Sequence, residues 1–251
     1  MTYKALRMFL VAALCPVSLT PLQLTLRGVG LGGAAASASA PTFESANSVE
    51  DTDAGTISMT ATTCTGSNKV MIIGVDFNSS SDVSFTTATY NGTDITGSKI
   101  AATAVNFTNA AIFVVVNPVS AATFAATTTS NANSMIVTAC YNGVNQTTPN
   151  RTATTGGGTT NPGTLAVTNS QTNDRIIGFF GLNDTSSANG MTAARVGAGQ
   201  TSRITTTSTS TESAGSISDE AGASGTVTHS WDFVNDASNG WNGIAIPLIP
   251  N

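Results

Sequence analysis

The sequence predicts an all-β protein, a two-sheet antiparallel β-sandwich of jelly-roll type that follows an apolar N-terminal leader or arm. Charged residues make up only 9% of the 251 residues, where a soluble domain usually carries about 25%, so the ionic surfaces of long amphipathic helices cannot be built. Polarity comes instead from 42 Thr, 27 Ser and 21 Asn. Threonine favours strands, whereas Asn and Ser favour turns.

Residues 1–40 differ in character from the rest of the chain. Lys4 and Arg7 precede an apolar stretch, and small residues follow it, in the order typical of a secretory signal peptide with cleavage after Ala38. Pro16 and Pro21 interrupt the apolar stretch, so we expect no stable membrane span, which needs about 20 mostly apolar residues in one helix. The alternative is an uncleaved arm that docks on neighbouring subunits.

Residues 41–251 are expected to form one sandwich domain, in which apolar runs alternate with clusters of Gly, Asn, Ser and Asp. The low-complexity stretches 152–160 and 205–215 are too polar for a core. The first of them suggests two half-sandwiches that meet near 152–162. Eleven strands are predicted, at 56–62, 69–77, 83–89, 99–105, 110–117, 135–141, 164–168, 175–182, 203–209, 225–231 and 241–248.

Three of the predicted strands contain continuous apolar runs rather than alternating ones, at 70–73, 112–116 and 176–180. Strands that are covered on both faces have this pattern. We expect one face of each to pack on the opposite sheet. The second face would then lie against a neighbouring subunit or under loops.

Two pairs of residues are typical of tight hairpins, Asn91-Gly92 and Asn142-Gly143, because each accepts positive φ after an apolar run. Without the leader, Cys64 and Cys140 are the remaining cysteines. They would form one disulfide in an oxidising compartment, or lie as buried free thiols inside strands.

The charges exclude some functions. A net charge of −5 lacks the basic surface that nucleic-acid binding needs, so no nucleic-acid partner is expected. The single histidine, His229, shares a strand face with Trp231 and points away from Ser230, which favours a packed or surface side chain over a catalytic one. Asp219 and Glu220 stand among Gly and Ser and are expected in a solvated loop. We predict no catalytic residue, no metal site and no cofactor.

A ligand site has four candidate residues near the C-terminus: Trp231, Asp236, Asn239 and Trp241. Two tryptophans could stack on the faces of a sugar, since amphipathic aromatic rings suit such surfaces. The competing interpretation places both rings in the core. A surface glycan is therefore one partner to consider.

Turn and strand signatures lie at 63–69, 88–92, 141–149, 197–201 and 241–248. Together they resemble a family of β-sandwich domains that recur in tailed-phage structural proteins and in secreted or surface proteins of bacteria. The resemblance covers about residues 55–251 and is hardly specific for function.

The resemblance and the scarcity of reactive side chains together predict a non-enzymatic structural protein of a phage virion, a capsid decoration or fibre-type subunit. It would be a homo-oligomer that also packs on other virion subunits through residues 1–40. The alternative is a secreted bacterial surface or filament protein with a role in adhesion or glycan binding.

Overall fold

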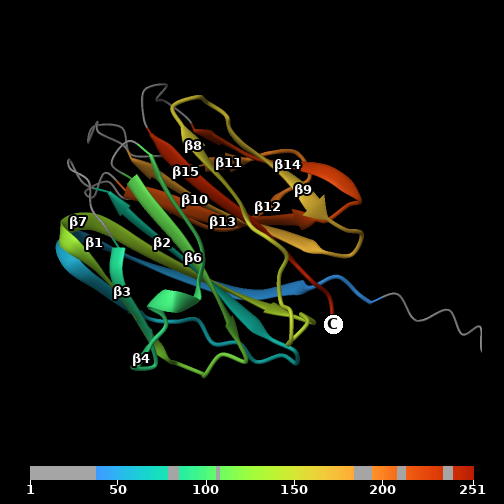
Figure 1. The fold of residues 1–251 in the computed structure, drawn as a ribbon, viewed down its shortest axis with the longest axis horizontal. Coiled ribbons are helices and arrows are strands. Elements are labelled where there is room, and N and C mark those ends of the chain that lie inside the picture. The colour runs from blue at the N-terminus through green and yellow to red at the C-terminus, as the bar shows by residue number, and fades with distance from the viewer. Residues whose placement is uncertain (1–37, 79–84, 106–107, 184–193, 208–212, 234–239) are drawn as a thin grey trace, which may run out of the picture. The chain divides into compact units, whose positions relative to one another are not determined.

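The structure, a computed structural model, describes residues 38–78, 85–105, 108–183, 194–207, 213–233 and 240–251. Most of these residues lie in antiparallel strands. The helical element in the described part of the chain is a single 3-10 turn at Thr96–Ser98. The all-β prediction is confirmed. The strands form three sheets where two were expected, and Figure 1 shows the elements in place.

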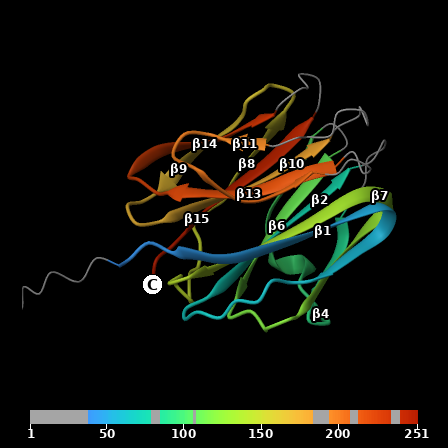
Figure 2. The ribbon, with the colours of Figure 1, turned by 180° about the vertical axis from the view of Figure 1, so that it is seen from behind.

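The first half of the chain builds a seven-stranded sheet with the order β4-β3-β7-β2-β6-β5, in which β1 also pairs with β7. Bulges near Asp51 and Ala54 interrupt the long β1–β7 pair, and the sheet curls there. Figure 2 shows these two long strands side by side. The bounds are β1 (Thr42–Thr60), β2 (Val70–Asn78), β3 (Phe85–Tyr90), β4 (Thr93–Asp94), β5 (Lys99–Val105), β6 (Thr108–Val116) and β7 (Thr123–Asn142).

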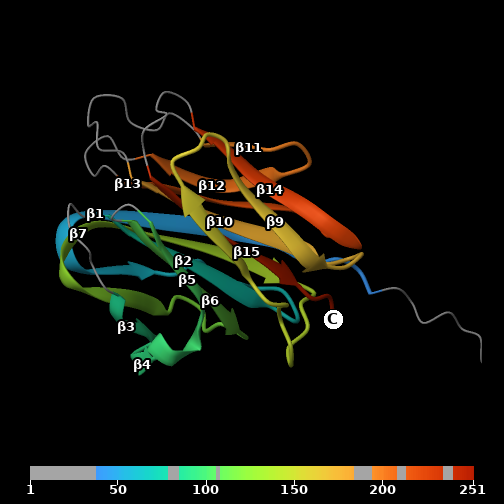
Figure 3. The same cartoon turned by 45° about the horizontal axis from the view of Figure 1, so that its top comes forward.

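The second half builds a five-stranded sheet, β12-β13-β10-β15-β8, and a three-stranded sheet, β11-β14-β9. The latter lies over β10 and β15 in Figure 3. Residues 152–160, expected as a link, contain an edge strand, and the described residues of 205–215 belong to the end of β12 and the start of β13. The bounds are β8 (Thr154–Gly158), β9 (Gly163–Ser170), β10 (Arg175–Asn183), β11 (Ala194–Val196), β12 (Thr201–Thr207), β13 (Ser213–Ala221), β14 (Gly225–Phe233) and β15 (Trp241–Leu248).

The apolar residues form three buried clusters, and central strands contribute to two of them. In β2, Met71 and Ile73 point into the curl of the first sheet, whereas Val70 and Ile72 pack toward the five-stranded sheet. In β10, alternate residues face the first sheet and the three-stranded sheet. The continuous apolar runs are therefore covered on both faces, as predicted. The cover comes from sheets of the same chain, not from loops or a neighbouring subunit.

Glycines allow the sheets to approach closely. A Cβ on Gly74 of β2 would lie 2.4 Å from a ring carbon of Phe179 on β10. A Cβ on Gly178 of β10 would lie 2.2 Å from Nε2 of His229 on β14. Each large side chain thus occupies the space above a glycine of the adjacent sheet, which fixes how the layers fit together.

Candidate functional site

A polar surface groove of about 620 Å³ lies beside the segment that joins the two halves of the chain. It is lined by Thr148, residues 150–152, residues 168–171 and Ile249. One wall is the segment that leads into β8, and the other is the end of β9 and the turn before β10. Small-molecule sites usually have volumes of about 300 to 1,000 Å³, so the groove is large enough for a ligand.

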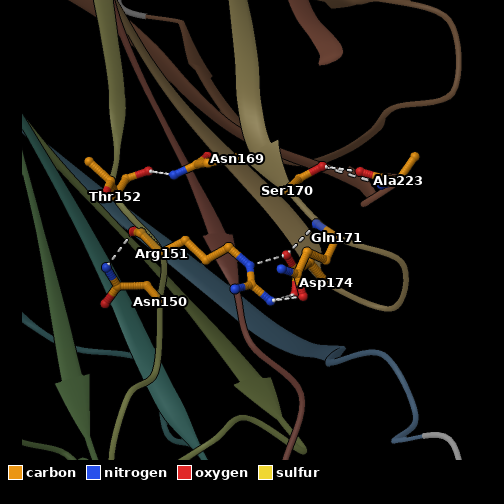
Figure 4. Close-up of polar contacts among 8 residues, drawn as sticks. All are labelled: Asn150, Arg151, Thr152, Asn169, Ser170, Gln171, Asp174 and Ala223. Atoms are coloured by element: carbon orange, nitrogen blue, oxygen red, sulfur yellow. Dashed lines mark hydrogen bonds and ion pairs between the residues drawn. The ribbon is translucent and has the colours of Figure 1, made fainter. Parts of the chain in front are cut away.

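The groove is organised by an ion pair between Arg151 and Asp174 (Figure 4). Nε of Arg151 donates to Oδ2 of Asp174 at 2.6 Å, and its Nη2 donates to Oδ1 at 3.1 Å. These hydrogen bonds raise the pKa of the Arg151 guanidinium, which therefore stays charged. Because Asp174 is only 1% exposed and neutralises it, the groove has little net charge to offer a ligand.

Three further contacts hold the lining in place. Nη2 of Arg151 donates to Oε1 of Gln171 at 2.9 Å, and the backbone N–H of Gln171 donates to Asp174 at 2.7 Å. On the opposite side, Nδ2 of Asn169 donates to the carbonyl of Thr152 at 2.7 Å, which ties the two walls together. The polar groups of the groove are thus preorganised, with hydroxyl and amide groups as its main chemistry.

A second cluster, of a type associated with catalysis, is buried. Both ring nitrogens of His229 form hydrogen bonds. Nδ1 lies 2.6 Å from Oε1 of Glu220, and Nε2 lies 2.8 Å from the hydroxyl of Ser218. A Ser-His-Glu series of this kind can activate a nucleophile. Here Ser218 and His229 are fully buried, so a substrate cannot reach the hydroxyl.

Asp219 and Glu220 were expected in a solvated loop, and this expectation is wrong. Both lie on β13, where Glu220 meets His229 and Asp219 is completely buried. Asp219 pairs with Arg203 at 2.6 Å and with Arg175 at 3.0 Å. Gly and Ser around the two carboxylates suggested a loop, but the segment is a strand. Small residues are present there because the sheets approach each other closely.

The tryptophan candidates do not form a sugar platform. Trp231 is fully buried and Trp241 is 4% exposed, and both rings stack on Phe180 with centroids 5.0 and 5.9 Å away. The rings therefore pack in the core, as the competing interpretation predicted. The other two candidates, Asp236 and Asn239, lie outside the described residues.

The structure joins Cys64 and Cys140 by a disulfide, with Cα atoms 5.5 Å apart. Cys64 precedes β2 and Cys140 lies on β7, and both side chains are buried in the cluster inside the curled sheet. In the described part of the chain, no three His, Cys, Asp or Glu residues are grouped to hold a metal ion, and no helix there is long and apolar enough to cross a membrane.

The groove was not foreseen from the sequence. Most of its lining residues come from two polar segments, 148–152 and 168–171, and Ile249 joins them from beyond β15. No local pattern in the sequence predicts that these segments meet. Comparison of the chain with protein-family models, with curated proteins and with solved structures gave no match.

Proposed function

We propose that the chain is a non-enzymatic structural protein that works outside the bacterial cytoplasm, as a surface or filament protein. The observation that carries the proposal is the buried disulfide between Cys64 and Cys140. Disulfides form and persist in oxidising compartments and are rare in the cytosol. The signal-like order of residues 1–40 supports the same setting.

The packing supports a scaffold role. The seven- and five-stranded sheets share one buried cluster, which suits a sandwich-type scaffold with these sheets as its two main layers. Three groups with reactive chemistry are buried and make contacts within the protein: Ser218, His229 and Asp219.

The export proposal is tested by expressing the full chain with its own N-terminus in a bacterium. We expect the mature chain in the periplasm or the medium, with an N-terminus near Ser39, and a Cys64–Cys140 peptide that mass spectrometry finds only without reductant. An intact Met1 on cytoplasmic material, with both thiols open to alkylation, would contradict export.

A virion subunit remains a second proposal, supported by the resemblance of the segments at 63–69, 141–149 and 197–201 to phage structural domains. Apolar strand faces, for which the sequence suggested a neighbouring subunit as one cover, do not support such packing, because those faces are covered within the chain. Assembly would then depend on residues 1–40. Deletion of these residues should abolish assembly, and a truncated chain that still assembles with full affinity would contradict an arm.

A further inference from the structure

We propose that the groove beside Arg151 binds a neutral oligosaccharide. The inference is compatible with the proposed display outside the cell but rests on the groove alone. The lining offers hydroxyls at Thr148, Thr152 and Thr168 and amides at Asn150 and Gln171, and these groups match the donors and acceptors of sugar hydroxyls.

The charge balance selects a neutral ligand. Arg151 is the cation of the lining, and the side chain of Asp174 engages it through two hydrogen bonds. An anionic ligand would have to compete with this carboxylate, whose position is also fixed by the backbone N–H of Gln171. A hydroxyl-rich neutral ligand needs no such exchange.

The backbone disfavours an extended peptide as the occupant. Peptides that add to a sheet edge need unpaired backbone donors and acceptors. Along the wall formed by residues 149–151, the N–H of Arg151 donates to the carbonyl of Pro247 at 2.9 Å, and the N–H of Ile249 donates to that of Pro149 at 2.9 Å. Asn150 and Leu248 also form a β-bridge, so the strand contacts of this wall are already made within the chain. On this wall, side-chain groups are left for recognition, and the peptide probe below tests the edge of β9 on the other wall.

The lining is held rigid, which reduces the cost of binding. The oxygen of Gln171 accepts from Arg151, so the amide is fixed in orientation before a ligand arrives. Preorganised groups lose less conformational entropy on binding. The groove has no aromatic side chain in its lining, and it is open to solvent, so the affinity should be low, with a Kd on the order of 1 mM.

The test is a titration of the full chain, isotope-labelled and followed by amide NMR shifts, with four probes. Maltotriose and triacetylchitotriose are the neutral sugars, trigalacturonic acid is the charged sugar, and a terminally blocked Ala-Ser tetrapeptide represents a peptide. We expect shifts from at least one neutral sugar that cluster at 148–152 and 168–171. No shift from either neutral sugar at tens of millimolar would overturn the proposal, as would stronger binding of the acid or of the peptide.

Matched variants on β9 and in the turn that follows it separate an effect on recognition from an effect on folding. Thr168→Ala and Gln171→Ala, at exposed positions, should each weaken binding roughly three- to ten-fold, the effect of one or two lost hydrogen bonds. Thr164→Ala lies on β9 and is also exposed but is not part of the lining, so it should bind within about two-fold of the parent. Equal binding by all three variants would overturn the proposal. Export is measured independently, so failure of one proposal leaves the other standing.

Discussion

The hydroxyl of Tyr141 on β7 donates a hydrogen bond to Oδ2 of Asp219 on β13 at 3.0 Å, across the boundary between the seven- and five-stranded sheets. Both residues are fully buried. Arg203 and Arg175 reach the same carboxylate from β12 and β10. One anion thus connects the two halves of the chain.

Asp219→Asn should destabilise the protein by about 3 kcal/mol, because it leaves Arg175 and Arg203 without their shared counter-charge. Tyr141→Phe removes one neutral donor and should cost about 1 kcal/mol. Urea unfolding checks both values. An equal loss of unfolding free energy in the two variants would contradict the role of Asp219 as the shared counter-charge of Arg175 and Arg203.

Tyr141 should not ionise while the protein is folded. Burial, and then the negative charge of Asp219, raise its pKa well above the ordinary value of 10.0, and burial also raises the pKa of Tyr90. Above pH 10 the unfolded chain therefore releases more protons than the folded one, and stability falls as the pH rises.

An alkaline titration at 295 nm checks this expectation. Part of the tyrosinate absorbance should appear only together with unfolding, as monitored by circular dichroism. In Tyr141→Phe, the absorbance change that accompanies unfolding should be smaller. A fully reversible titration of all tyrosines before unfolding would contradict the buried position of Tyr141.

The close approach of β2 and β10 depends on a missing side chain. Gly74→Ala would place a methyl group 2.4 Å from Phe179 and should cost about 2 kcal/mol, since the ring has other buried neighbours. Gly97→Ala is the matched control, because nothing lies within 4 Å of its Cβ position. Thermal unfolding should separate the two variants clearly, and similar melting temperatures would argue against tight sheet packing at Gly74.

The disulfide should contribute about 4 kcal/mol to stability, because it closes a loop with a sequence separation of 76. Adding reductant should therefore lower the urea midpoint of the parent. The variant that combines Cys64→Ala and Cys140→Ala is the control, and its midpoint should not respond to reductant. An unresponsive parent would mean that the bond does not form.

Glu44 should stabilise the fold at neutral pH and lose this effect in acid. Burial tends to raise its pKa, but hydrogen bonds from the hydroxyl and the N–H of Thr65 outweigh this and hold the pKa below 4.5. A lowered folded-state pKa gives stability above the unfolded value that is lost as the pH falls through the folded one.

Glu44→Gln should cost about 0.5 kcal/mol at pH 7, a small value because the side chain is partly solvated, and should cost nothing near pH 2. Melting temperatures at the two pH values measure the difference. Glu50→Gln, on the same strand, controls for the loss of one negative charge. An equal pH response in both variants would rule out a specific role for the contacts with Thr65.

Local patterns identified the strands whose side chains were apolar or alternating, among them β2, β6, β10 and β15. They missed the short strands β4, β8 and β11 and most of β1. They also missed the first half of β7, and β13, where Thr, Ser, Asn and paired acids resemble a loop. The sequence also predicted part of the backbone conformation. Asn91 and Gly92 have φ of 51° and 75° at the β3–β4 hairpin, as predicted, and Asn68 and Asn173 share positive φ before β2 and β10.

The second Asn-Gly pair was not a hairpin. Asn142 remains in β7, and Gly143, at φ 72°, donates its N–H to the carbonyl of Ser67 instead of reversing the chain. The dipeptide permits a left-handed residue, but long-range pairing decides what that residue does. The same limit applies to Asp219, whose burial depends on three partners that are distant in sequence.

By itself the sequence determined that this protein satisfies its backbone through strand ladders, because few charges and abundant Thr leave no basis for exposed helices. It also determined that its central strands are covered on both faces. Only the tertiary structure decided what covers them, which carboxylates are buried and where a groove opens. Those features arise where segments remote along the chain meet, and composition and periodicity report only on neighbours in sequence.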